Sequence, residues 1–114
     1  MALIHPTEQW QTTRVKLGTI VSGVTYRNPG LLAKMVATLD VVSGGRLIVG
    51  VAAGYLKPEF RAVGTEFDDR TDRLEDALRL LPRIWSEESV AAEGPGYRAG
   101  AVTAAPRPWQ RPHP

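Results

Sequence analysis

Small residues and one tyrosine follow the two most apolar segments of the chain. Ser22-Gly23-Val24-Thr25 comes after the first of these segments, and Ala52-Ala53-Gly54-Tyr55 comes after the second. Such residues leave room for a flat ligand and expose backbone amides to it, while Tyr55 adds an aromatic face and a hydroxyl. An equally supported interpretation is that the glycines and alanines only ease tight turns and that Tyr55 covers the core.

Other residue types that carry chemistry are scarce or badly spaced. The absence of cysteine excludes thiolate metal sites and cysteine nucleophiles. His5 and His113 lie near opposite ends of the chain, each beside a proline, which favours plain surface histidines over a metal site. Asp68-Asp69 and Glu87-Glu88 stand at predicted helix ends, where capping or solvation explains them. Gly50–Gly54 lacks the GxGxxG spacing, so no motif of this kind names a reaction.

The elements that must position the two small-residue segments form a βαβ pattern. Arg14–Val21 is rich in β-branched residues and predicts a central strand. Asn28-Pro29 then predicts a helix start, because Asn caps well and Pro is favoured at the first helical position. The stripe of that helix is Leu31, Leu32, Met35, Val36 and Leu39, and Ser43-Gly44-Gly45 ends it.

A second strand is predicted over Arg46–Val51, and its nearly continuous apolar character is typical of a parallel strand covered on both faces. Two such buried strands joined by one helix predict a βαβ unit, in which the strands are parallel and the crossover is right-handed. Ligands of parallel α/β proteins bind beyond the carboxyl ends of the strands, which is where both small-residue segments lie.

The rest of the chain continues the α/β pattern and then loses it. Helices are predicted over 58–63 and 69–85, and weak β segments flank Gly94-Pro95-Gly96. The proline-rich end from Pro106 predicts a connector that is not helical. We therefore divide the chain into an extension over 1–12, a βαβα segment over 13–85, and an irregular hairpin with a proline-rich connector over 86–114.

Composition excludes several classes of partner. The 114 residues carry 14 basic and 12 acidic side chains, a net charge of +2 that is spread along the chain, so no nucleic-acid partner is expected. The longest apolar run, Leu47–Leu56, is about half the roughly 20 residues that a membrane-spanning helix needs. With no secretory signal at the start, we expect a cytoplasmic protein without a membrane partner.

Several strings in fixed order resemble the bacterial luciferase-like monooxygenase family. They are Arg14–Thr19, Tyr26–Pro29, Leu31–Lys34, Ala37–Asp40, Ser43–Leu47, Gly50, Gly54–Leu56, Pro58–Phe60, Phe67, Trp85, Pro106–Pro108 and Gln110–Pro114. The resemblance implies a partial (β/α)8 TIM barrel, an α/β fold with a parallel βαβ core and following helices. It also implies a flavin- or F420-dependent oxidoreductase that transfers hydride at an FMN or F420 ring, or oxygenates a small-molecule substrate.

The resemblance also implies which residues border the ring. They are Val21, Ser22, Gly23, Val24, Ala53, Gly54 and Tyr55. In similar proteins the turn that matches Ile20–Val24 supports the ring and sometimes contains a non-proline cis peptide. Some relatives place a carboxylic acid where this chain has Tyr55, so Tyr55 is only a weak catalytic candidate. The similarity of Gly54–Leu56 and Pro58–Phe60 to F420-using members gives a mild preference for F420.

A complete barrel needs about 250 residues, so the sequence predicts an internal fragment of such an enzyme. The alternative from another functional class is a non-catalytic βαβ module that forms homo-oligomers through its open strand edges.

Overall fold

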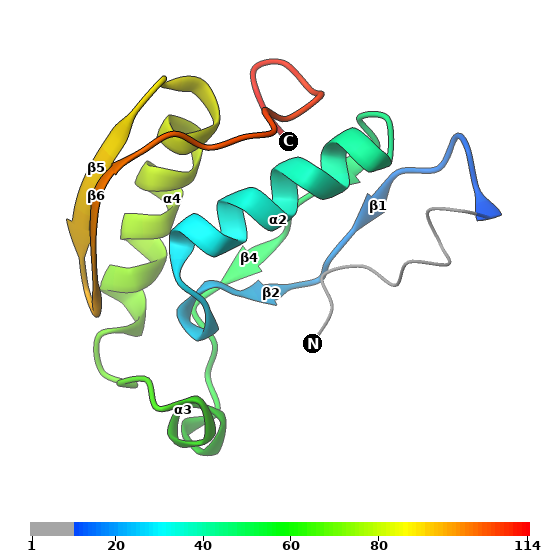
Figure 1. Cartoon of the computed structure of the whole chain (residues 1–114). Helices are drawn as coiled ribbons and strands as arrows, with labels where there is room; N and C mark the ends of the chain where they lie inside the picture. Colours follow the sequence, from blue (N-terminus) through cyan, green and yellow to red (C-terminus); the bar gives the residue numbers. More distant parts are fainter. Residues whose placement is uncertain (1–10) are drawn as a thin grey trace.

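The computed structural model describes residues 11–114; His5 and most of the predicted extension lie outside this part (Figure 1). In chain order the elements are β1 (Leu17–Gly18), β2 (Ser22–Gly23), the short 3-10 turn η1 (Val24–Tyr26), α2 (Pro29–Val42), β3 (Leu47–Ile48), β4 (Val51–Ala52), α3 (Lys57–Val63), α4 (Arg70–Ser86), β5 (Val90–Gly94) and β6 (Tyr97–Val102).

Two pairs of short parallel strands form the βαβ core. β1 pairs with β3, so that Leu17 lies opposite Leu47, and β2 pairs with β4, so that Ser22 lies opposite Val51. Between these pairs, residues 19–21 of the first segment lie opposite residues 49–50 of the second. The first segment therefore contains one extra residue, which forms a bulge. The parallel direction was predicted correctly, whereas the prediction of two uninterrupted strands was wrong, because an apolar run does not show where its ladder breaks.

Helix α2 connects the two strand segments as predicted. The Asn28 side chain accepts a hydrogen bond from the Gly30 amide at 2.8 Å, and Pro29 occupies the first turn. At the other end Gly44 has a φ of 67°, a left-handed conformation that lets the chain leave the helix. Of the predicted stripe, Leu32 and Val36 are buried while Leu31 is exposed. The buried face of α2 is thus shifted toward Ala33, Ala37 and Asp40.

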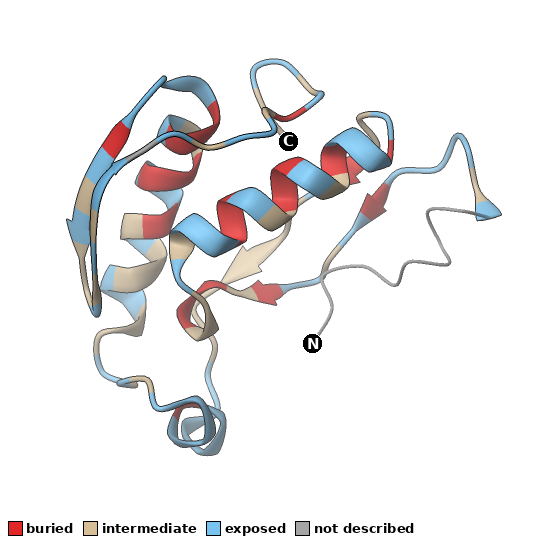
Figure 2. Cartoon of the chain, in the orientation of Figure 1, coloured by how far each residue is buried: buried red, intermediate tan, exposed pale blue. Residues whose placement is uncertain are grey.

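Only one face of the strand layer is covered by helices (Figure 2). Leu17 and Leu47 are buried on the face that packs against α2. Ile48 keeps 56% of its surface exposed, and Ile20 is fully exposed. The prediction of strands covered on both faces was therefore wrong for this chain. Each strand has a single partner strand among residues 11–114, so β1 is not central, and the face opposite α2 stays open.

Helix α4 packs beside α2 and carries the β5–β6 hairpin on its far side (Figure 1). The indole nitrogen of Trp85 in α4 donates a hydrogen bond to the carbonyl oxygen of Ala33 in α2 at 2.9 Å. The helix continues through Pro82 to Ser86, so the proline does not end it. The buried apolar cluster contains Leu17, Val24, Leu32, Ala33, Val36, Ala37, Leu47, Ala77, Leu80, Leu81, Ile84, Trp85 and Val90.

The proline-rich segment after β6 packs back onto the helices. The backbone amide of Gln110 donates to Asp40 Oδ2 at 2.8 Å, and its side-chain amide donates to Asp40 Oδ1 at 2.7 Å. The same side-chain amide also donates to the carbonyl oxygen of Leu47 in β3 at 2.8 Å. Arg107 donates to the carbonyl oxygen of Ile84 at 3.0 Å. The segment is therefore part of the packed structure and joins α2, α4 and β3.

The described residues thus form a parallel α/β arrangement with following helices and an antiparallel hairpin. No closed barrel is present within residues 11–114. The geometry agrees with the coarse prediction of a partial α/β layer, with its strand ends gathered at one edge.

Candidate functional site

The carboxyl ends of β2 and β4 lie side by side. Gly23 is the register partner of Ala52, and the Thr25 hydroxyl donates a hydrogen bond to the carbonyl oxygen of Ala53 at 2.9 Å. This bond ties the turn after β2 to the loop after β4. The two small-residue segments therefore meet at one edge of the strand layer, as their positions after parallel strands predict.

The seven predicted site residues divide by burial. Ser22 and Val24 are buried, and Ser22 Oγ accepts a hydrogen bond from Arg27 Nη1 at 3.2 Å. Val21 and Tyr55 are 47% and 79% exposed. The remaining three, Gly23, Ala53 and Gly54, are half-buried. Val21 and Tyr55 thus keep exposed side chains near the paired strand ends, whereas the Ser22 and Val24 side chains belong to the packed interior.

The bulge between β1 and β2 contains a cis peptide bond between Ile20 and Val21. This agrees with the cis peptide that similar proteins sometimes have in the matching turn. The Thr19 hydroxyl donates to the carbonyl oxygen of Gly50 at 2.9 Å, so a side chain of the bulge contacts the neighbouring strand. The bulge therefore keeps apolar Ile20 and Val21 exposed beside the strand ends.

An aromatic cluster that we did not predict supports the loop after β4. The ring centroids of Tyr26 and Phe60 are 5.3 Å apart, and those of Phe60 and Phe67 are 5.1 Å apart, both with edge-to-face geometry. Gly54 has a φ of 85°, and a Cβ there would lie 2.8 Å from the Tyr26 hydroxyl. Gly54 is therefore required both by backbone conformation and by the close approach of Tyr26.

The Tyr26 hydroxyl donates a hydrogen bond to Glu59 Oε2 at 2.7 Å. This bond to the Glu59 carboxylate, with a smaller effect from burial, raises the pKa of Tyr26 to about 12. The tyrosine therefore stays protonated, and remains a donor, at neutral pH. The sequence shows an aromatic residue, Tyr26, after the first strand segment and an acid, Glu59, in the short helix after the second strand segment. Their spacing gives no indication that the two side chains meet.

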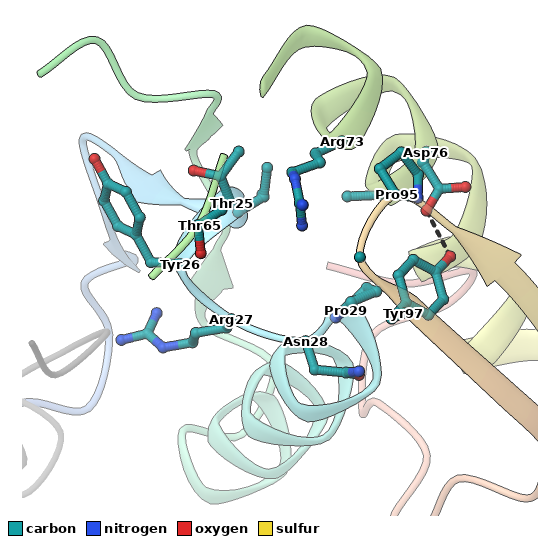
Figure 3. A pocket seen from close by; sticks show the side chains of 13 residues that line it. Thr25, Tyr26, Arg27, Asn28, Pro29, Thr65, Arg73, Asp76, Pro95 and Tyr97 are labelled. Atoms are coloured by element: carbon teal, nitrogen blue, oxygen red, sulfur yellow. Dashed lines mark hydrogen bonds between the residues drawn. The ribbon is translucent and has the colours of Figure 1, made fainter. Parts of the chain in front are cut away.

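A cavity of about 180 Å³ lies between η1, helix α4 and the turn of the β5–β6 hairpin (Figure 3). Arg73 points into it and forms an ion pair with Asp69 at 2.7 Å, while Tyr97 donates to Asp76 at 2.5 Å. Burial, followed by the Asp76 carboxylate, raises the pKa of Tyr97. Of the seven predicted site residues only Val24 lines this cavity. The other six predicted site residues therefore lie outside the lining of this cavity.

The described part of the chain contains neither a candidate metal cluster nor a membrane-spanning helix. Residues 11–114 contain no group of three or more His, Cys, Asp or Glu that could hold a metal ion. Among these residues no helix is long and apolar enough to cross a membrane. His113 lies against Trp85, with ring centroids 5.4 Å apart.

Known proteins resemble this chain across almost its whole length. The luciferase-like monooxygenase family matches residues 10–114. The chain belongs to the luciferase-like monooxygenase family. It is 43% identical over 90 residues to an FMNH(2)-dependent dimethylsulfone monooxygenase of Pseudomonas putida, covering 76% of this chain and 25% of that protein. It is also 41% identical over 104 residues to an F420-dependent glucose-6-phosphate dehydrogenase of Kineococcus radiotolerans, covering 88% of this chain and 31% of that protein.

The solved structure of a monooxygenase has a similar arrangement of elements. The monooxygenase RslO1 from Streptomyces bottropensis matches with a TM-score of 0.87 and 40% identity, over 93% of this chain and 32% of that one. The chain therefore spans between a quarter and a third of the length of these three relatives. The predicted family was correct, and relatives that use either of the two predicted cofactors are among the similar proteins.

Proposed function

We propose that the open face near Val21 and Tyr55 forms part of the ring-binding site of a flavin- or F420-dependent oxidoreductase. The observation that carries the proposal is the junction of the two strand ends, where Gly23 pairs with Ala52 and Thr25 bonds to Ala53. This junction lies at the edge where parallel α/β proteins bind their ligands. The relatives named above use FMNH(2) or F420, which supports a ring of this class.

The residues present fit one side of such a ring. Val21 and Ile20 expose apolar surface in the bulge, and Tyr55 exposes an aromatic side chain beyond β4. Apolar and aromatic surface favours the stacking of a flat conjugated ring. When bound, the ring would supply hydride transfer or, for FMN, oxygenation of a small-molecule substrate. The chain's own residues would hold the ring and exclude water from its buried side.

None of the seven proposed site residues is charged. The phosphate group of FMN would therefore gain no ion pair from them, and the ring itself would supply the affinity. At about 0.3 kcal/mol per atom, a ring of roughly 20 atoms would contribute about 6 kcal/mol, which corresponds to a dissociation constant of tens of micromolar. We expect riboflavin, which lacks the phosphate, to bind within about threefold of FMN.

Fluorescence titration of the purified chain with FMN, riboflavin and F420 tests the proposal. Val21→Asp should weaken ring binding at least tenfold, because it puts a carboxylate under the ring. Val42→Asp is the matched control, since Val42 is 56% exposed on α2. A chain that bound none of the three compounds, or an unchanged affinity in Val21→Asp, would overturn the proposal. If the chain does bind a ring, comparing its dissociation constants for F420 and FMN would assign the cofactor class.

A further inference from the structure

Tyr26 joins the two strand exits through three contacts. Its hydroxyl donates to Glu59 at 2.7 Å, and its ring packs edge-to-face on Phe60 with centroids 5.3 Å apart. Its hydroxyl also lies against the backbone of Gly54, where a Cβ would come within 2.8 Å of it. One side chain from η1 therefore touches both the loop after β4 and the helix α3 that follows it.

The loop over residues 53–56 depends on such outside contacts. The Tyr55 side chain is largely exposed and does not anchor the loop in the interior. The hydrogen bond from Thr25 holds the first residue, Ala53. Backbone bonds from Glu59 and Phe60 to the carbonyl oxygen of Leu56 hold the last residue. Between these two points, Gly54 rests on Tyr26 and Phe60.

We propose that Tyr26, together with Glu59, is a positioning residue that fixes the loop 53–56 and so sets where Tyr55 meets the ring and the substrate. The inference rests on the proposed function for its role in binding, but its structural part can be measured without any ring. A protonated phenol beside a carboxylate keeps the loop fixed over the whole neutral range, which is consistent with the raised pKa of Tyr26. Tyr26 itself is not a catalytic residue in this proposal.

The chain offers a matched control for the central substitution. Tyr97, like Tyr26, donates to a carboxylate on a helix, in this case Asp76 at 2.5 Å. It lies on the hairpin side of the cavity beside η1, and no residue of the loop 53–56 lines that cavity. Tyr26→Phe and Tyr97→Phe therefore remove the same chemical group, and only the first removes it from the loop.

Backbone order parameters from ¹⁵N relaxation test the structural part. In the parent chain we expect residues 54–56 near 0.85, about the value of rigid backbone, and in Tyr26→Phe below about 0.6. Glu59→Ala should give the same loss, because it removes the acceptor. Glu59→Gln should restore the parent values, because its amide oxygen accepts the same hydrogen bond. Tyr97→Phe should leave the loop unchanged.

Ring titration of the same variants tests the role in binding. If the parent binds FMN or riboflavin, Tyr26→Phe and Glu59→Ala should lower that affinity about five- to tenfold, and Glu59→Gln by less than about twofold. Unchanged order parameters in Tyr26→Phe, or an equal loss in Tyr97→Phe, would overturn the inference. If no variant bound a ring while the order parameters changed as expected, the proposed function would fail and Tyr26 would stand as the residue that fixes the loop.

Discussion

Replacing Asp40 by alanine removes a fully buried carboxylate that holds the proline-rich segment against α2. Two hydrogen bonds end on it, from the backbone and side-chain amides of Gln110 at 2.8 and 2.7 Å. A hydrogen bond to a charged group contributes about 1.5–3 kcal/mol. Because Gln110 is only partly buried, we take the lower end, which gives a loss of about 3 kcal/mol, or on the order of a hundredfold in the unfolding equilibrium.

Gln110→Ala should cost less than Asp40→Ala. It removes the side-chain donor to Asp40 and to Leu47, whereas the backbone amide still reaches the carboxylate. We expect a loss of about 1.5–2 kcal/mol. In the double variant the side-chain bond is lost only once, so the two effects should fall short of additivity by about 1.5 kcal/mol.

Urea denaturation, monitored by tryptophan fluorescence, measures these free energies of unfolding. Trp109 is next to Gln110 in the chain, so its fluorescence reports on the proline-rich segment itself. Asp68→Ala is the control, because Asp68 is exposed and its loss should change stability by less than about 0.5 kcal/mol. Additive effects of Asp40→Ala and Gln110→Ala, to within about 0.5 kcal/mol, would refute the assignment of the carboxylate as the group that holds Gln110.

Three further predictions concern single residues. Gly54→Ala should destabilise the chain by about 2 kcal/mol in urea denaturation, because its φ of 85° and the adjacent tyrosine exclude a Cβ; Gly100→Ala, with open space around it, should not. The pKa of Tyr26 is raised from 10, the value of an ordinary tyrosine, to about 12. Its hydrogen bond to Glu59 should therefore stabilise the fold fully below pH 10, and this contribution to the free energy of unfolding should be lost as the pH rises through 12. The difference in tyrosinate absorbance between the parent and Tyr26→Phe measures that titration, and a midpoint near pH 10 would contradict it. Trp85→Phe removes the donor to a backbone carbonyl of α2 and should cost about 2 kcal/mol, measured by circular dichroism; a change below about 0.5 kcal/mol would show that water replaces the bond.

Local signals in the sequence were sufficient for the βαβ core. Asn28-Pro29 and Ser43-Gly44 act within a few residues, the first through a side-chain cap and the second through backbone conformation, so they mark the bounds of α2 without knowledge of the fold. The meeting of Gly23 with the end of β4 followed from the parallel direction alone.

Contacts between distant residues were not predictable in this way. Tyr26 and Glu59 are 33 positions apart, and Asp40 and Gln110 are 70 positions apart, so neither pair produces a periodic signal. The open face was also missed, because an apolar strand looks the same whether one face or both are covered. Val24 follows the strand like its neighbours, and only the three-dimensional packing places its side chain in the interior.

The bulge between β1 and β2 absorbs one additional residue without changing which side chains of the first strand segment face the interior. Leu17 and Ser22 are an odd number of positions apart, yet both are buried, whereas their partners Leu47 and Val51 are separated by an even number. Side chains alternate along a strand, so deleting one residue of 19–21 would leave an even separation, which keeps Ser22 facing inward opposite Val51 and removes only the bulge. The extra residue therefore adds exposed apolar surface at Ile20 and Val21 and leaves the buried side of the strand layer as a regular strand would have it.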